Sequence, residues 1–223
     1  MSTIQADFDD LALLPADKWD HNTHYHEFLL RQVPSPCRQS LEIGCGTGAF
    51  SRLLAGRSDQ VLALDLSQNM IRIAKEQSSA YPNVDFLVTD VMDHEFEADQ
   101  FDCIVSIATL HHLPTEAAVR KITRALKVNG VLLILDLFQA DGIFDAFRSA
   151  VALPASMAVR LTKGSRIVPP RRVRAAWAKH GRNDSYLSLK QVHELCSALL
   201  PGAEVKSHLF WRYSVIWKKP ATV

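Results

Sequence analysis

Short β-rich apolar runs alternate with amphipathic stretches from Arg38 to Leu137. The runs predict strands over residues 40–43, 61–65, 84–88, 101–106 and 131–137. Several of them are apolar almost throughout, as strands are when helices cover both faces of a parallel sheet. Strands that alternate with helices form βαβ units, in which neighbouring strands run parallel. The alternation therefore predicts an α/β fold with a mainly parallel sheet.

Local residues predict three helix boundaries. Ser67 is typical of an N-cap, and Ser188 followed by Gln191 three residues later predicts a capping box. A helix that starts at Thr115 is expected to stop at Asn129–Gly130, a pair that suits a left-handed C-cap.

One domain is the expected organisation, because 223 residues with 48% hydrophobic content can bury one large core. Residues 203–217 predict two more strands, which makes seven, with an antiparallel strand at the C-terminus. Ligands of open α/β sheets bind beyond the carboxyl ends of the strands, so segments that interrupt the alternation are expected to be lids there. The predicted parts are an N-terminal lid (1–36), a cofactor-binding core (37–138), a basic lid insertion (139–187) and a C-terminal helix with a strand pair (188–223).

The charge balance excludes a strong global field, since 25 basic and 24 acidic side chains leave a net charge of +1. Nucleic-acid and membrane binders commonly carry such a field, so no stable nucleic-acid partner is expected. Residues 1–10 are acidic and lack the regions of a signal peptide, and no apolar run reaches membrane-spanning length. We therefore expect a cytoplasmic protein without membrane insertion.

A glycine loop follows the first predicted strand, with Gly44, Gly46 and Gly48 on alternate positions before a helix. Glycine suits a turn that needs positive φ or that a ligand approaches closely. The loop predicts a nucleotide-type site. The spacing Gly44-x-Gly46-x-x-Ala49 also fits the dinucleotide fingerprint, so the loop alone leaves the cofactor open.

Three acidic residues near this loop narrow the choice of cofactor. Asp65 ends the second predicted strand, where an acid can accept hydrogen bonds from ribose hydroxyls of NAD or S-adenosylmethionine alike. Asp90 follows the third strand at the same rim, and two rim acids favour a nucleoside without phosphates. Glu42 adds negative charge where a pyrophosphate would lie, and suits a cationic amino-acid end instead.

Taken together, these motifs resemble the class I S-adenosylmethionine-dependent methyltransferases. The matching run is Glu42-x-Gly44-x-Gly46-x-Gly48, then Asp65, Asp90, Phe101-Asp102-Cys103-Ile104-Val105-Ser106 and Ala125-Leu126-Lys127-x-x-Gly130, in the family's order over residues 38–137. The resemblance implies a Rossmann-like seven-stranded sheet. It also implies methyl transfer from S-adenosylmethionine by in-line displacement, with S-adenosylhomocysteine as the product.

The resemblance further implies which residues contact the donor. The glycines would approach its methionine part, an acid its ribose, and a residue after the third strand its adenine. The implied cofactor-binding residues are Glu42, Gly44, Gly46, Gly48, Asp65, Leu66, Asp90, Val91 and Ile107.

Histidines supply the candidate general bases, because a hydroxyl, amine or carbon acceptor can need a proton removed near neutral pH. His112 and His111 follow the fourth predicted strand and are the first candidates. Tyr25 lies among three histidines of the N-terminal segment and could touch donor or acceptor if that segment folds over the cofactor. No acidic cluster follows the fourth strand as in metal-dependent O-methyltransferases, so no metal is expected.

The insertion carries a local basic patch, with eight Lys or Arg and no acid between Arg160 and Arg182. Such a patch could hold an anionic substrate, touch a membrane surface or bind RNA. The leading prediction is a methyltransferase acting on a small molecule, and an anionic acceptor that carries carboxylate or phosphate is favoured over RNA. The alternatives are an RNA or protein methyltransferase, an NAD-dependent oxidoreductase, and a binding protein without catalysis. The sequence does not determine the oligomeric state.

Overall fold

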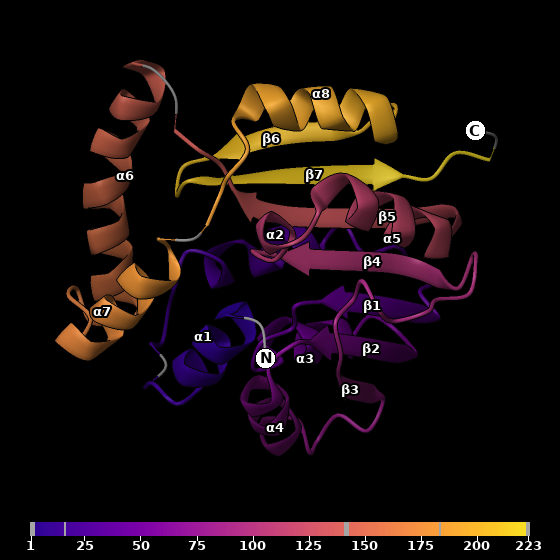
Figure 1. Ribbon diagram of the computed structural model, residues 1–223, viewed down its shortest axis with the longest axis horizontal. Helices are drawn as coiled ribbons and strands as arrows, with labels where there is room; N and C mark the ends of the chain where they lie inside the picture. Colours follow the sequence, from indigo (N-terminus) through magenta and orange to yellow (C-terminus); the bar gives the residue numbers. More distant parts are fainter. Residues whose placement is uncertain (1–2, 16, 141–142, 183, 222–223) are drawn as a thin grey trace.

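The computed structural model describes residues 3–15, 17–140, 143–182 and 184–221, without the side chains of residues 3 and 143–147. In this part of the chain seven strands form one sheet, in the order β3-β2-β1-β4-β5-β7-β6 (Figure 1). Strands β1 to β5 pair in parallel, and β7 runs antiparallel to both β5 and β6. The mostly parallel Rossmann-like sheet with antiparallel pairing at the C-terminus is confirmed. The strands are β1 (Gln39–Ile43), β2 (Gln60–Asp65), β3 (Val84–Val88), β4 (Phe101–Ile107), β5 (Leu126–Leu137), β6 (Glu204–His208) and β7 (Arg212–Lys218).

Helices cover both faces of the sheet, which explains the apolar runs. On β4 and β5, alternate residues enter two different cores. Ile104 and Leu132 pack in one core with α5 (Thr115–Ala125) and α8 (Leu189–Leu199). Val105 and Leu133 pack in the other core with α2 (His26–Leu30) and α3 (Ala49–Leu54). Successive strand residues point to opposite faces, so a strand covered on both sides needs an apolar residue at every position.

Two predicted helix starts are confirmed. Ser67 caps α4 (Gln68–Gln77), because its Oγ accepts the N–H of Met70 at 3.1 Å. Ser188 and Gln191 form the reciprocal capping box at the start of α8.

The predicted end of the helix that starts at Thr115 was wrong. This helix, α5, ends at Ala125, and Leu126 is extended and begins β5 beside Phe101. Asn129 does take a left-handed φ of 65°, but inside β5, where its N–H donates to the carbonyl of Lys219. The Asn129–Gly130 pair therefore makes a bend within the strand. Pairing with two neighbouring strands outweighs the local preference for a helix C-cap.

The segments predicted to be lids contribute helices beyond the carboxyl ends of the parallel strands, at the left of Figure 1. They are α1 (Thr3–Ala12), α6 (Ile143–Thr162) and α7 (Arg171–His180), and α1 packs against α4 and α7. The short helices η1 (Thr23–Tyr25) and η2 (Leu110–His112) complete the set. Across the described residues, none of the helices has both the length and the apolar character needed to cross a bilayer.

Candidate active site

The crevice of this sheet lies between β1 and β4, the neighbouring strands from which the chain winds in opposite directions. Gly44 follows β1 and has a φ of 70°. A Cβ built on it would lie 2.0 Å from the Oγ1 of Thr109, which follows β4. Gly44 is therefore required both by its backbone conformation and by the close approach of the two loops.

The glycine loop and the end of β2 are joined by one carboxylate. Asp65 accepts the N–H of Gly46 and the N–H of Ser67, each at 2.8 Å. Burial raises the pKa of Asp65 above its ordinary value. Gly46 has a φ of 52°, and a Cβ there would meet nothing within 4 Å. Space is thus open beside the loop at the position where a ligand is expected.

The N-terminal helix α1 lies over the same strand end. Gln5 donates from Nε2 to the carbonyl of Leu66 at 3.2 Å, and Asp9 accepts the hydroxyl of Ser67 at 2.6 Å. Asp9 also accepts the N–H of Asn69 at 3.1 Å, so it serves as a second cap for α4. Asp9 could not be identified from the sequence, because it caps a helix about 60 residues away along the chain.

The other predicted donor contacts lie on the same edge of the sheet. Asp90 follows β3 and closes a turn by accepting the N–H of Met92 at 2.8 Å. Val91 is buried in the core, and Ile107 is the half-buried last residue of β4. The parallel strands β2, β3 and β4 end at the same edge of the sheet. Asp65 and Ile107 are the last residues of β2 and β4, and Asp90 comes shortly after β3, so all three lie at that edge. Their contacts with a donor stay predictions.

Glu42 is a buried acid within β1, 2% exposed, whose Oε2 accepts the hydroxyl of Ser51. Burial raises the pKa of Glu42 to about 8, and the negative charge of Asp65 adds to the effect. The carboxyl group is therefore largely neutral near pH 7. A cation that approached it would favour the ionised form.

Replacing Glu42 by glutamine is expected to stabilise the ligand-free protein at pH 9 and to change little at pH 4. An unfolded chain releases this proton near 4.5, whereas the folded protein keeps it until about 8. The free energy of folding that depends on the protonated Glu42 is therefore fully present below pH 4.5 and is lost as the pH rises through 8. Calorimetric thermal midpoints should differ by roughly 5 °C or more at pH 9 and converge at pH 4. The exposed Glu204→Gln is the control, and a difference that does not change with pH would contradict the raised pKa.

His111 and Asp136 form a buried pair at the ends of β4 and β5. The Nδ1 of His111 lies 2.6 Å from Oδ1 of Asp136, and its backbone N–H donates to Oδ2 at 3.0 Å. A carboxylate only accepts, so it holds the proton on Nδ1 and leaves the lone pair on Nε2. Sequence reasoning missed Asp136. The available signal was an acid at the carboxyl end of an otherwise apolar strand.

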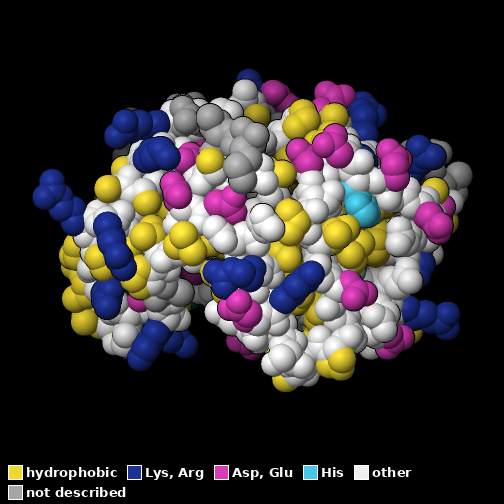
Figure 2. Space-filling model, turned by 60° about the horizontal axis from the view of Figure 1, so that its bottom comes forward, with side chains coloured by type: hydrophobic (Ala, Val, Ile, Leu, Met, Phe, Trp, Pro, Cys, Tyr) yellow, Lys and Arg dark blue, Asp and Glu magenta, His cyan; other side chains and the backbone are white. Residues whose placement is uncertain are grey.

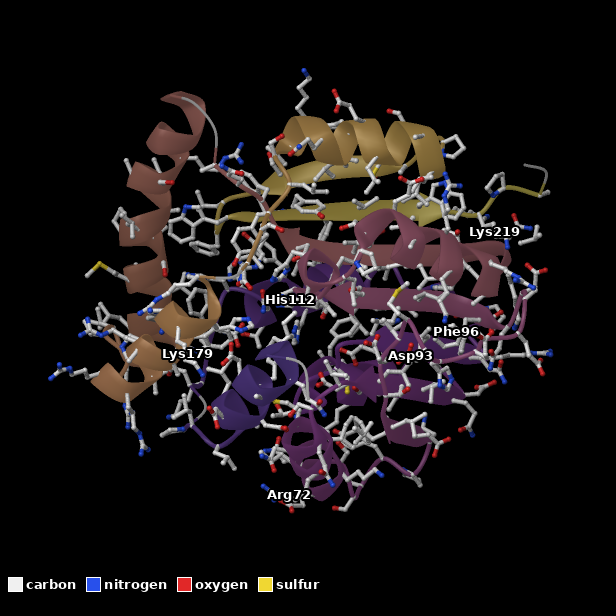
Figure 3. All side chains as sticks on the ribbon, viewed as in Figure 1. Arg72, Asp93, Phe96, His112, Lys179 and Lys219 are labelled. Carbon is white, nitrogen blue, oxygen red and sulfur yellow. The ribbon has the colours of Figure 1, made fainter. Side chains whose placement is uncertain are left out.

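His112 occupies a different environment at the centre of the molecule (Figure 3). The rings of Phe8 and His180 pack on it at 5.4 and 5.0 Å, and its Nδ1 lies 3.5 Å from Oδ1 of Asp184. Burial, assisted by the neighbouring His111, lowers the pKa of His112 to about 4. His112 is therefore neutral at pH 7 and a weak proton acceptor.

The two predicted lid segments meet beside His112. Asp7 on α1 contacts Lys179 on α7 at 2.7 Å and lies 3.9 Å from His180. Phe8 packs on both His112 and His180. Residues from two distant parts of the chain, α1 and the insertion, thus cover this histidine.

A cavity of about 290 Å³ opens beside His111, between the strand ends and the end of the insertion. Tyr186 lines it and donates from its hydroxyl to Oδ2 of Asp184 at 2.8 Å. The lining residues are Leu110, His111, Leu113, Thr115, Asp136, Leu137, Gln139, Ser185, Tyr186, Leu187, Gln191 and Tyr213. A cavity of this kind suits a small molecule.

Tyr25 is not brought to this cavity. Its ring packs with His208 and Phe210, and its hydroxyl accepts the N–H of Phe210 at 3.1 Å. It lines a separate cavity of about 300 Å³ with His24 and Phe28. This arrangement gives no support to a catalytic role for Tyr25.

The histidines around Tyr25 lie in two environments. His21 and His24 both pack on Trp19 and Phe210, whereas His26 packs on Phe50. Among the residues that the structure describes, one group of three could share an ion: His111, His112 and Asp184. The prediction that no metal is used is not tested by this geometry.

Comparisons with known proteins agree with the fold. Residues 41–134 match the family model described as a methyltransferase domain. An uncharacterized methyltransferase of Mycobacterium bovis is 29% identical over 206 residues, 91% of this chain and 98% of that protein. A demethylmenaquinone methyltransferase of Lysinibacillus sphaericus is 28% identical over 127 residues, 55% of this chain and 52% of that protein. The N-methyltransferase NodS of Bradyrhizobium japonicum, solved with S-adenosylhomocysteine, shares the fold with a TM-score of 0.65 at 16% identity, covering 98% of this chain and 100% of NodS.

The sheet order, the glycine loop at its switch point and the matched segment define a Rossmann-like methyltransferase domain. The matched segment, the methyltransferase relatives and the shared fold support a class I S-adenosylmethionine-dependent methyltransferase. The oxidoreductase alternative is not supported.

Proposed function

We propose that this enzyme transfers a methyl group from S-adenosylmethionine to a small molecule held in the cavity beside His111. The observation that carries the proposal is the His111–Asp136 pair, which lines a cavity at the carboxyl ends of β4 and β5. S-adenosylmethionine supplies an electrophilic methyl group on its sulfonium when bound. Positioning of the acceptor is the main task left to the protein and can contribute about 7–11 kcal/mol.

The residues present fit the donor. Gly46 leaves open space beside the loop, Asp65 lies at the strand end beside it, and Glu42 is a buried acid of raised pKa. In the proposal, the glycine loop approaches the methionine part, Asp65 and Leu66 hold the ribose, and Asp90 with Val91 meets the adenine. Glu42 would ionise as the amino-acid end approaches, since a nearby cation favours the charged form.

His111 is proposed as the general base. Asp136 fixes the tautomer and the ring orientation, as an acid does when it is paired with a catalytic histidine. Nε2 of His111 can then take the proton of a hydroxyl or amine in the cavity. His112 is proposed to position the lid helices around the site, because its low pKa makes it a poor base. This assignment reverses the order in which the sequence ranked the two histidines.

The acceptor is proposed to be a small molecule with a neutral hydroxyl or amine. The name of the Lysinibacillus relative gives demethylmenaquinone as one acceptor that is neither RNA nor protein. The anionic acceptor suggested by the sequence stays a prediction: no Lys or Arg is among the residues that line the cavity. An RNA or protein acceptor has only the basic insertion in its favour.

Calorimetric titration with S-adenosylmethionine, S-adenosylhomocysteine and NAD tests the donor. We expect micromolar binding of the first two and no binding of NAD. Methyl transfer from labelled donor is then measured against a panel of phenols, quinols, amines, carboxylic acids and total RNA. Turnover of RNA alone, or NAD binding without donor binding, would contradict the proposal.

A further inference from the structure

The outer face of α6 is apolar and exposed. Ala152 and Ser156 face the molecule, and Ser149 on the same side accepts the indole N–H of Trp211 at 2.9 Å. On the exposed side of the helix Leu153, Met157 and Leu161 are 58%, 49% and 61% exposed. Their spacing of four residues places them in one stripe along the helix. No charged residue occurs from residue 149 to residue 159.

Positive charge adjoins this stripe along the chain. Exposed cations follow on the connection to α7 and on its first turn, and the exposed Val168 and Trp177 lie among them. Arg160 and Lys179 pair with Asp17 and Asp7. Figure 2 shows yellow and dark blue side chains together on the lobe at the left, which α6 and α7 form. Between described side chains, no ion pair is formed by Lys163, Arg166, Arg171, Arg172 or Arg174.

We propose that α6 and α7 form a docking surface for an anionic lipid bilayer. Its apolar members are Leu153, Met157, Leu161, Val168 and Trp177, and its cationic members are Lys163, Arg166, Arg171, Arg172 and Arg174. Apolar side chains on a helix enter the boundary between headgroups and acyl chains, while neighbouring Lys and Arg attract anionic headgroups. The inference does not depend on the identity of the methyl acceptor.

Two other occupants fit this surface less well. A second copy of the chain would pair the same patch across a two-fold axis, which brings the arginines of both copies together. Single-stranded nucleic acid would need aromatic side chains interleaved with the cations, and Trp177 is the exposed aromatic residue of the docking surface. The combination of a continuous apolar stripe with excess positive charge is complementary to an anionic bilayer.

Cosedimentation with lipid vesicles tests the proposal on the full chain. Vesicles of phosphatidylcholine and phosphatidylglycerol in equal parts are compared with vesicles of phosphatidylcholine alone. We expect binding to the anionic vesicles, little binding to the neutral ones, and weaker binding as salt screens the charges.

Two sets of variants separate the contributions. The triple variant Arg171→Ser, Arg172→Ser and Arg174→Ser should weaken vesicle binding about 100-fold, because each cation contributes about tenfold or less. Leu153→Ser, Met157→Ser and Leu161→Ser together should weaken it by roughly tenfold or more. Matched controls on other faces are the exposed set Lys75→Ser, Arg124→Ser and Lys190→Ser, and Leu87→Ser on β3. The controls should bind vesicles as the parent chain does.

Four results would overturn the proposal. One is equal binding of both vesicle types. A second is binding that both sets of variants leave unchanged. Another is a dimer in solution that the Leu153, Met157 and Leu161 set dissociates, since a second copy would then cover this face. The last is tight binding of single-stranded RNA by a chain that does not bind vesicles. Thermal midpoints of all variants show that the surface changes leave the fold intact.

Discussion

Replacing His111 by alanine is expected to lower kcat by about 10²- to 10⁴-fold, the usual contribution of a general base. The dissociation constant for S-adenosylmethionine should stay within about twofold, because the contacts of His111 are with Asp136 and the acceptor cavity. The measurement is methyl transfer to the acceptor found by screening, combined with calorimetric titration of the donor.

Matched variants distinguish chemistry from folding. His111→Gln keeps a side-chain donor that can reach Asp136 but has no basic nitrogen, so it should lose activity while retaining its thermal midpoint. Asp136→Asn should also reduce kcat, since the amide no longer selects the tautomer. His112→Ala should reduce kcat less, because His112 is neutral at pH 7. Full activity of His111→Gln, or activity abolished by EDTA, would refute a metal-free base at this position.

Replacing Asp65 by alanine is expected to raise the dissociation constants for S-adenosylmethionine and S-adenosylhomocysteine by about 100-fold or more. A hydrogen bond to a charged group contributes about 1.5–3 kcal/mol, and two ribose hydroxyls would each lose one. The affinity should fall for any acceptor, because the residue acts on the donor. Calorimetric titration of both ligands measures the effect.

The contacts of Asp65 with the glycine loop require a second variant. Asp65→Asn retains an oxygen that can accept the N–H of Gly46 but carries no charge, so it should weaken donor binding with less effect on the thermal midpoint. Asp85→Ala removes an exposed acid from the neighbouring β3 and should change neither quantity. Unaltered donor affinity in Asp65→Ala would remove this residue from the proposed site.

The residues proposed for the cofactor half of the site could be named from the sequence because their signals are local. Gly44, Gly46 and Gly48 all take positive φ, which the residue type itself permits at little cost. Asp65 ends β2 and Asp90 comes shortly after β3, two strands whose apolar pattern could be read, and strands in parallel register end at one edge. Where local preference and sheet pairing competed, at Asn129–Gly130, the boundary predicted from the sequence was wrong.

The acceptor half depended on the tertiary structure. Both histidines after β4 have the same local context, and the tertiary structure distinguishes them. His111 pairs with the buried carboxylate of Asp136, whereas burial lowers the pKa of His112. The insertion places His180, Asp184 and Tyr186 at the same site, and α1 brings Phe8 to it.

The alternation of strands and helices was enough to predict the fold class, and the glycine loop with the acids near it, through their resemblance to a known family, indicated the methyl donor. Backbone conformation and burial on two faces depend on residues close in sequence, so their pattern can be read directly. The pairing of His111 with Asp136 and the meeting of α1 with α7 join residues far apart along the chain. Such contacts are set by strand register and helix packing, so only the tertiary structure decided which side chains share the acceptor cavity.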